Sequence, residues 1–297
     1  MSEARSIAVI GLGAMGFALA KRLVEGGHRV SGYDIRPDVV LEFAAIGGAG
    51  AESVSDAVSS ADVIIVFVMN SDQLDHVLFA AGALEAAKPT ATVISMVTAA
   101  PARIAEIAAR VTATQRGFID APVSGGVPGI EAGTLTIMAS APRREFAAVE
   151  TLLREIGSNT FHLGEAPGQG SAMKTVNQLL AGVHIAAGAE ALALAEAEGI
   201  DPAAALEILM SGAAQSWMLG NRGPRMVDPG DTVASSVEIF VKDLGIVLAT
   251  GTAARLGLPL SAAAHQQFLN ASGLGLGSAD DSQVIETYRA FHKKPTP

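Results

Sequence analysis

The sequence contains no cysteine, and aromatic residues make up only 4% of its 297 residues. Without cysteine there can be no disulfide, no thiolate metal site and no cysteine nucleophile. Charged residues are also scarce, at 17%, and the acidic ones outnumber the basic ones to give a net charge of −10. Because phosphates bind basic surfaces, this charge argues against a nucleic-acid partner.

Targeting and membrane-spanning signals are lacking as well. The opening stretch MSEARSIAVIG holds one short apolar run and no long hydrophobic region, unlike a signal peptide. No uninterrupted apolar run reaches the length of about 18 residues that a membrane helix needs. The six histidines are scattered, so we expect no metal site. We expect a cytoplasmic protein that does not bind membranes.

Apolar residues are abundant, at 49%, which is enough to fill two cores and to leave a surplus for a subunit interface. Apolar runs alternate with helical patterns up to residue 163, and we expect strands at 6–10, 28–33, 63–69, 91–95, 117–120, 134–139 and 159–163. Helical patterns interrupt them at 101–112 and 142–156, and only helical patterns follow residue 200, at 202–211, 237–256, 261–271 and 281–291. The sequence therefore predicts an α/β Rossmann-like dinucleotide-binding domain over 1–164. An all-α substrate and oligomerisation domain follows over 165–297.

A long helix over about 168–199 should join the two domains, since this stretch lacks proline and repeats Leu, Ala and Met at helical spacing. Lys174 stands near its start, and Asn177 follows one turn later. A cation within an apolar helix start is costly unless it has a partner or a role. From spacing alone, a lysine that reaches from the helix end to water explains the pattern equally well.

A glycine pattern follows the first expected strand. Gly11, Gly13 and Gly16 have the G-x-G-x-x-G spacing between a strand and a helix, and Asp34 ends the next strand, 23 residues after Gly11. This arrangement is typical of dinucleotide binding, where glycines let the backbone approach a pyrophosphate at a helix N-terminus. The alternative is a turn without function. The cofactor-binding residues expected here are Gly11, Leu12, Gly13, Ala14, Met15 and Gly16.

Asp34 should decide between the two nicotinamide cofactors. A carboxylate at this place accepts hydrogen bonds from ribose hydroxyls and repels a 2′-phosphate, which favours NAD. Arg36, two residues further on, could bind that phosphate instead. We predict NAD, with NADP as the weaker alternative. Ligands of open α/β sheets bind beyond the carboxyl ends of the strands, so Met69, Asn70 and Met96 are further expected cofactor contacts.

Four stretches resemble the β-hydroxyacid dehydrogenases, the family that contains 3-hydroxyisobutyrate dehydrogenase and tartronate semialdehyde reductase: GLGAMG (11–16), DAPVSGGVPGIEAGTLTIMAS (120–140), GQGSAMKTVNQ (168–178) and FVKDLG (240–245). They occur in the family's order over nearly the whole chain. The resemblance implies that Lys174 is catalytic, that Ser124, Gly125 and Gly126 bind substrate, and that Lys242 lines the active site.

Chemical reasoning from the same residues agrees with the resemblance. Oxidation of a secondary alcohol requires loss of its hydroxyl proton, which a positioned lysine can accept. Burial and a second lysine nearby would each lower the pKa of such a lysine toward neutrality. The Ser124 hydroxyl with two glycine amides could hold a carboxylate, and Asn177 could orient an oxygen or the ammonium. Taken singly, Ser-Gly-Gly could be a plain turn, and Lys242 with its neighbour Asp243 a surface ion pair.

Some positions depart from the family pattern. Asn177-Gln178 stands in place of Asn-Asn, and Ser95-Met96 in place of Ser-Thr, so Thr98 or Ser95 would have to replace the missing threonine. Trp217, the only tryptophan, should pack within the helical domain. The alternative is that its neighbours Gln215, Ser216 and Asn221 reach a polyol.

Three functions remain open from the sequence. We favour NAD-dependent oxidation of a small hydroxy acid, and the stretches at 178–195, 215–222, 241–245 and 280–288 resemble the family members that oxidise the C2 hydroxyl of L-threonate. The runner-up is an NAD(P)H-dependent reductase of tartronate semialdehyde, succinic semialdehyde or 3-hydroxyisobutyrate-type substrates. A non-catalytic nucleotide sensor is the alternative of another class. The apolar linking helix also predicts a homodimer or homotetramer, because a helix that is apolar on every side must be buried on every side.

Overall fold

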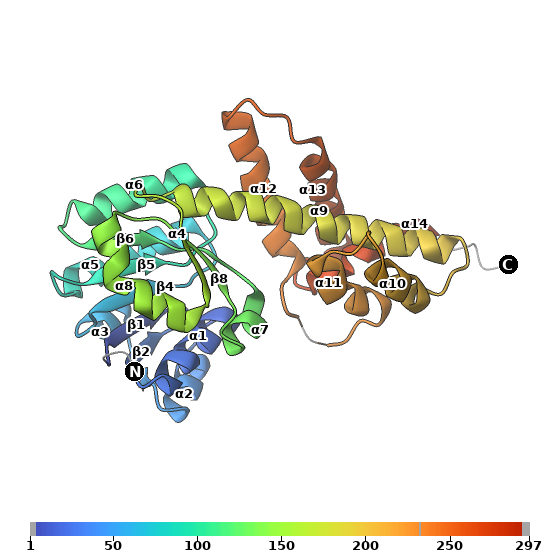
Figure 1. Ribbon diagram of the computed structural model, residues 1–297. Coiled ribbons are helices and arrows are strands. Elements are labelled where there is room, and N and C mark those ends of the chain that lie inside the picture. The colour runs from blue at the N-terminus through green and yellow to red at the C-terminus, as the bar shows by residue number, and fades with distance from the viewer. Residues whose placement is uncertain (1–3, 232, 293–297) are drawn as a thin grey trace. The chain divides into compact units, whose positions relative to one another are not determined.

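The computed structural model describes residues 4–231 and 233–292, and the chain divides into two compact units, Met1–Lys174 and Thr175–Pro297 (Figure 1). The predicted fold class is confirmed: the N-terminal unit is a Rossmann-like α/β structure, and the C-terminal unit is helical.

The main sheet of the N-terminal unit is parallel, with the order β3-β2-β1-β4-β5-β6 among the described residues. Its strands are β1 (Ser6–Ile10), β2 (Arg29–Tyr33), β3 (Ala49–Gly50), β4 (Val63–Val66), β5 (Thr92–Ser95) and β6 (Gly117–Asp120). Successive strands from β1 to β3 are added on one side of β1, and those from β4 to β6 are added on its other side. The point between β1 and β4 is therefore a topological switch point. Dinucleotides bind at such a switch point in doubly wound folds.

Helices cover both faces of this sheet, which explains the continuous apolar runs in its strands. Ile7 and Val9 of β1 belong to one core, while Ala8 and Ile10 belong to the core on the opposite face. A strand buried on both faces needs no polar alternation. The helical segments of this unit are α1 (Ala14–Glu25), α2 (Pro37–Ala45), α3 (Val54–Val58), α4 (Ser71–Asp75), η1 (His76–Ala80), α5 (Ala83–Ala86), α6 (Pro101–Thr112), α7 (Gly126–Glu131) and α8 (Arg143–Ile156).

The last two expected strands do not join the main sheet. A second sheet consists of β7 (Val123–Ser124), β8 (Thr136–Ala139) and β9 (Asn159–His162), with β7 antiparallel and β9 parallel to β8. A short bridge between Asp120 and Ser140 connects the end of β6 to the residue after β8. Sequence patterns show that a segment is a strand but do not show which strand it pairs with.

The long helix α9 runs from Gln169 to Ala197, close to the predicted range. By length and composition it could cross a membrane, and half of its most apolar 18-residue window is buried inside the protein. The C-terminal unit continues with α10 (Pro202–Ser211), α11 (Trp217–Val227), α12 (Val237–Ala253), α13 (Pro259–Ala271), η2 (Ser272–Leu276), η3 (Asp281–Ile285) and α14 (Glu286–His292).

The sequence did not predict α11, because Gly220, Gly223 and Pro224 within it all disfavour helix. The two glycines permit close packing on α10. A Cβ at Gly223 would lie 2.5 Å from a methyl carbon of Leu206, and one at Gly220 would lie 2.8 Å from the terminal carbon of Met210. The close contact between the two helices thus compensates for the poor intrinsic propensity.

Candidate active site

The turn after β1 contains Gly11, Gly13 and Gly16, whose surroundings differ. A Cβ at Gly11 would lie 2.5 Å from the carbonyl oxygen of Phe67, and one at Gly16 would lie 1.9 Å from the carbonyl oxygen of Gly11. Both positions therefore exclude any side chain. At Gly13, by contrast, no described atom beyond the adjacent residues lies within 4 Å of such a Cβ, and Gly13, as the N-cap of α1, supplies no side chain to cap this helix. This open, uncapped helix start fits the pyrophosphate of a dinucleotide.

Asp34 follows β2 and is hydrogen-bonded to the glycine turn. Its Oδ2 accepts from the Leu12 amide at 2.8 Å, and its Oδ1 accepts from the Arg36 amide and Nε, both at 3.0 Å. Burial by itself would raise the pKa of the Asp34 carboxyl, but the hydrogen bonds from Arg36 and Leu12 hold that pKa below its ordinary value. Asp34 is thus a carboxylate whose orientation is coupled to the turn, and Arg36 already pairs with it.

The other expected cofactor residues lie at the ends of β4 and β5. The Met69 side chain is 58% exposed, whereas Met96 is 2% exposed and packs in a core. The Asn70 side chain caps α4 by accepting from the Gln73 amide at 2.9 Å. Ser95 is fully buried, and its hydroxyl has no hydrogen-bond partner within the described residues, while Thr98 is partly buried. Of the two possible replacements for the missing threonine, Thr98 is therefore the accessible one.

The Ser-Gly-Gly motif forms a turn between β7 and α7. Ser124 ends the strand, and Gly125 and Gly126 follow with φ angles of 129° and 66°. A residue with a side chain would be strained at both positions. The backbone thus turns sharply where the resemblance implies that the substrate binds.

Lys174 lies in the second turn of α9 and is 7% exposed. The start of this helix is fixed by two buried side chains that no sequence pattern marks as its partners. The carboxylate of Asp120 accepts hydrogen bonds from the Gly168 and Ser171 amides at 2.9 and 2.8 Å, and the Ser140 hydroxyl accepts from the Gly170 amide at 2.9 Å. The only sequence signal for this role was the position of Asp120 at the first place of the DAPVSGG stretch.

In the C-terminal unit, Asn177, Gln178 and Lys242 belong to one hydrogen-bonded group around Asp243. Asp243 is 2% exposed and accepts from Gln178 Nε2 and from Lys242 Nζ, each at 2.5 Å. Asn177 donates to the Gln178 side-chain oxygen at 2.9 Å. Lys242 and Asp243 are therefore not a surface ion pair, and Gln178 uses its extra length to reach α12.

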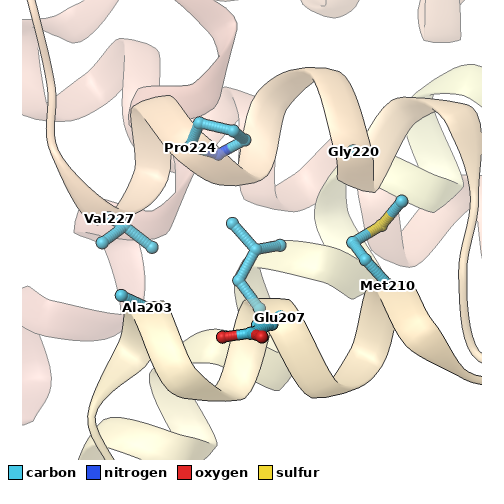
Figure 2. A pocket seen from close by; sticks show the side chains of 7 residues that line it. Ala203, Glu207, Met210, Gly220, Pro224 and Val227 are labelled. Atoms are coloured by element: carbon cyan, nitrogen blue, oxygen red, sulfur yellow. The ribbon is translucent and has the colours of Figure 1, made fainter.

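Two shallow hollows lie along α10 and α11 of the C-terminal unit. The first, of about 450 Å³, is mainly apolar, and Figure 2 shows Met210 and Pro224 on its two walls. The second, of about 460 Å³, includes Trp217, which is 61% exposed. The prediction that Trp217 packs within the helices is therefore wrong. Neither Lys174 nor Lys242 lines these hollows.

Comparison with known families assigns both units. Residues 6–164 match the NAD binding domain of 6-phosphogluconate dehydrogenase, and residues 168–288 match the NAD-binding of NADP-dependent 3-hydroxyisobutyrate dehydrogenase.

Individual relatives cover almost the whole chain. An L-threonate dehydrogenase of Cupriavidus necator is 44% identical over 285 residues, 96% of each chain. A 3-hydroxyisobutyrate dehydrogenase of Pseudomonas aeruginosa is 34% identical over 272 residues, covering 88% of this chain and 90% of its own. The crystal structure of a 3-hydroxyisobutyrate dehydrogenase from Salmonella typhimurium superposes with a TM-score of 0.90 at 37% identity, over 95% of this chain and 99% of that one.

The dinucleotide-type glycine turn, the buried lysine at the start of α9 and these full-length matches agree with one another. The chain belongs to the 3-hydroxyisobutyrate dehydrogenase-like family of hydroxyacid dehydrogenases.

Proposed function

We propose that this dehydrogenase oxidises a small hydroxy acid with NAD, and that its substrate is L-threonate, oxidised at the C2 hydroxyl to 2-dehydro-L-erythronate. The observation that carries the substrate is the 44% identity to an L-threonate dehydrogenase over 96% of the chain. The Asp34 carboxylate supports NAD, because it would accept hydrogen bonds from ribose hydroxyls and repel a 2′-phosphate.

In this proposal Lys174 is the general base. The Gly11–Gly16 turn and Asp34 would hold the nicotinamide cofactor, which would supply the acceptor for the C2 hydride. Neutral Lys174 Nζ takes the proton of the C2 hydroxyl as the hydride leaves, so that a carbonyl remains at C2. The Ser124 hydroxyl and the amides of Gly125 and Gly126 hold the carboxylate of the acid. For Asn177 and Lys242 we propose further contacts to substrate, and for Lys242 also to the cofactor.

Initial rates with a panel of hydroxy acids test this function. The panel contains L-threonate, D-threonate, D-erythronate, 3-hydroxyisobutyrate and D-glycerate, each with NAD and with NADP, and the appearance of the reduced cofactor is followed at 340 nm. The highest kcat/KM is expected for L-threonate with NAD. A higher value for 3-hydroxyisobutyrate, or turnover only with NADP, would contradict the proposal.

One observation favours a second candidate, an NAD(P)H-dependent reductase of a semialdehyde acid. Arg36 lies two residues after Asp34 with a half-exposed side chain, so it could turn from the carboxylate to a 2′-phosphate. Assays in the reverse direction distinguish the two candidates. They use tartronate semialdehyde and succinic semialdehyde as substrates and compare NADH with NADPH. A preference for NADPH would favour the reductase.

We further propose a homo-oligomeric, cytoplasmic enzyme whose nucleotide and substrate domains correspond to residues 1–164 and 165–297. Large apolar side chains are exposed along the helices of the C-terminal unit: Leu180, Leu194, Ile208, Trp217 and Leu260 are each more than half exposed. A two-fold partner would cover such side chains, and two dimers could form a tetramer. Light scattering tests this directly, because an active monomer of 30.2 kDa would contradict the proposal.

A further inference from the structure

The carboxylate of Asp120 lies at the centre of a buried network at the end of β6. Asp120 and Ser140 are both 0% exposed, and Ser171 is 1% exposed. Besides the amides of Gly168 and Ser171, the Ser171 hydroxyl donates to Asp120 Oδ1 at 2.7 Å, and the Ser140 hydroxyl donates to Oδ2 at 3.2 Å. Four donors thus converge on one buried carboxyl group.

This arrangement suits the ionised form of the carboxyl group. All four partners are donors, so both oxygens must accept, and the positive end of the α9 dipole stabilises a negative charge there. Burial nevertheless raises the pKa of the Asp120 carboxyl above its ordinary value, even though the hydrogen bonds from Ser171, Gly168 and Ser140 act in the opposite direction. Burial of a carboxylate raises the free energy of the folded state, whereas a helix cap at the surface does not require this burial.

The helix start is also pressed against the strand ends. A Cβ at Gly170 would lie 2.3 Å from the carbonyl oxygen of Met138 and 2.9 Å from that of Asp120. Only glycine fits there. Main-chain hydrogen bonds join Asp120 and Ser140 in both directions, at 3.1 and 2.7 Å. The first turn of α9 is therefore held by both sheets at once.

The same carboxylate connects the two stretches to which the proposed function assigns the chemistry. Asp120 precedes Ser124 by four residues along the chain, and Ser171 precedes Lys174 by three residues, less than one helical turn. A shift of the first turn would move Lys174 relative to the Ser124–Gly126 turn. Misplacement of about 1 Å is enough to cost roughly a hundredfold in rate.

We propose that Asp120 is a positioning residue of the dehydrogenase: by capping α9 from inside the fold, it holds Lys174 in register with the Ser-Gly-Gly turn. This inference rests on the proposed function, in which Lys174 is the base and Ser124–Gly126 bind the acid. Asp120 itself does not touch the reacting atoms.

The alternative is that Asp120 only stabilises the fold, and a double-mutant cycle separates the two roles. In Asp120→Asn, one oxygen becomes an NH₂ group that faces donors, while size and shape stay the same. We expect kcat to fall at least about tenfold and the KM of the cofactor to change less than about twofold. In the Lys174→Ala background the same substitution should lower the remaining rate less than about twofold, because the base that it positions is gone.

Two further variants complete the design. Ser171→Ala removes the hydrogen bond from the Ser171 hydroxyl to Asp120, and it replaces Asp120→Asn in the test if that variant does not fold. We expect Ser171→Ala to lower kcat as well, by a smaller factor. Asp201→Asn is the matched control, because Asp201 caps α10 through the Ala204 amide at 2.9 Å and should leave kcat unchanged. An equal loss of rate in both backgrounds, or unchanged kcat in folded Asp120→Asn, would overturn the proposal.

A second readout does not depend on turnover. Lysine acylation followed by peptide mass spectrometry measures the labelling rate of Lys174 against the exposed Lys21 in the same molecule. Release of the helix start should raise the Lys174 rate severalfold in Asp120→Asn and leave that of Lys21 unchanged. Wild-type protein that oxidises no acid of the panel would contradict the proposed function. An unchanged Lys174 rate would contradict the positioning role independently.

Discussion

Replacement of Asp34 by serine is the sharpest test of cofactor choice. Serine keeps a polar group at the end of β2 but removes the charge. It also removes the acceptors of the Leu12 amide and of Arg36. The variant should therefore bind NAD less tightly, because two ribose hydroxyls lose a charged acceptor. It should also tolerate a 2′-phosphate, because the repulsion is gone and Arg36 is released.

The expected loss of NAD affinity follows from the strength of hydrogen bonds to a charged group, which contribute about 1.5–3 kcal/mol each. Loss of one such contribution corresponds to about a 10- to 100-fold lower kcat/KM with NAD. The Leu12 amide also loses its partner, and this effect on the glycine turn weakens both cofactors alike. The ratio of kcat/KM for NAD to that for NADP cancels the common loss and isolates the effect of the 2′ group.

The assay is steady-state kinetics with both cofactors at a saturating hydroxy acid, for wild type, Asp34→Ser and Asp34→Ser/Arg36→Ala. We expect the NAD/NADP ratio to fall at least about tenfold in the single variant, and part of the NADP gain to disappear in the double variant. An unchanged ratio would refute the reasoning, because Asp34 would then be a residue of the turn only.

Three further predictions concern other parts of the molecule. Lys174→Ala should lower kcat by about 10²–10⁴-fold and leave the dissociation constant of NAD, measured by fluorescence titration, nearly unchanged; near-normal kcat would show that Lys174 is not the general base. Gly16→Ala should abolish NAD binding or lower Tm, because its Cβ would lie 1.9 Å from the Gly11 carbonyl oxygen. Calorimetric titration measures the binding and thermal unfolding measures Tm. Unchanged values of both would show that the turn does not bring Gly16 against Gly11. Asp280 has a lowered carboxyl pKa, because hydrogen bonds from Ser282, Arg225 and Ala234 outweigh the effect of burial. A carboxyl group whose pKa is lower in the folded state stabilises the fold at pH values above its unfolded-state pKa of about 3.9. This stabilisation is lost as the pH falls through the folded-state pKa. Asp280→Asn should therefore lower Tm at pH 7, and its difference from wild type should shrink in acid; a pH-independent difference would contradict the ion-pair reasoning.

Local and near-local patterns in the sequence were sufficient for much of this protein. The spacing of Gly11, Gly13 and Gly16 and the acid at Asp34 follow from the chemistry of a strand-turn-helix-strand unit, whose parts are close along the chain. Continuous apolar runs indicated strands buried on both faces, and the proline-free repeat indicated α9. These signals depend on periodicity over a few residues, so a single chain displays them.

Pairings between distant residues needed the tertiary structure. Asp120 meets Ser171 across 51 positions, and Gln178 meets Asp243 across 65. No local period marks such partners, because each contact exists only after separate elements have packed. The same reason explains the second sheet, because no local pattern shows which strand another strand pairs with. It also explains α11, whose glycines disfavour helix until α10 packs against them. The sequence by itself determined the fold class, the long helix and most of the strands. Tertiary packing decided which buried side chains hold the start of α9, because the free energy of burying a carboxylate depends on donors that only the folded chain brings together.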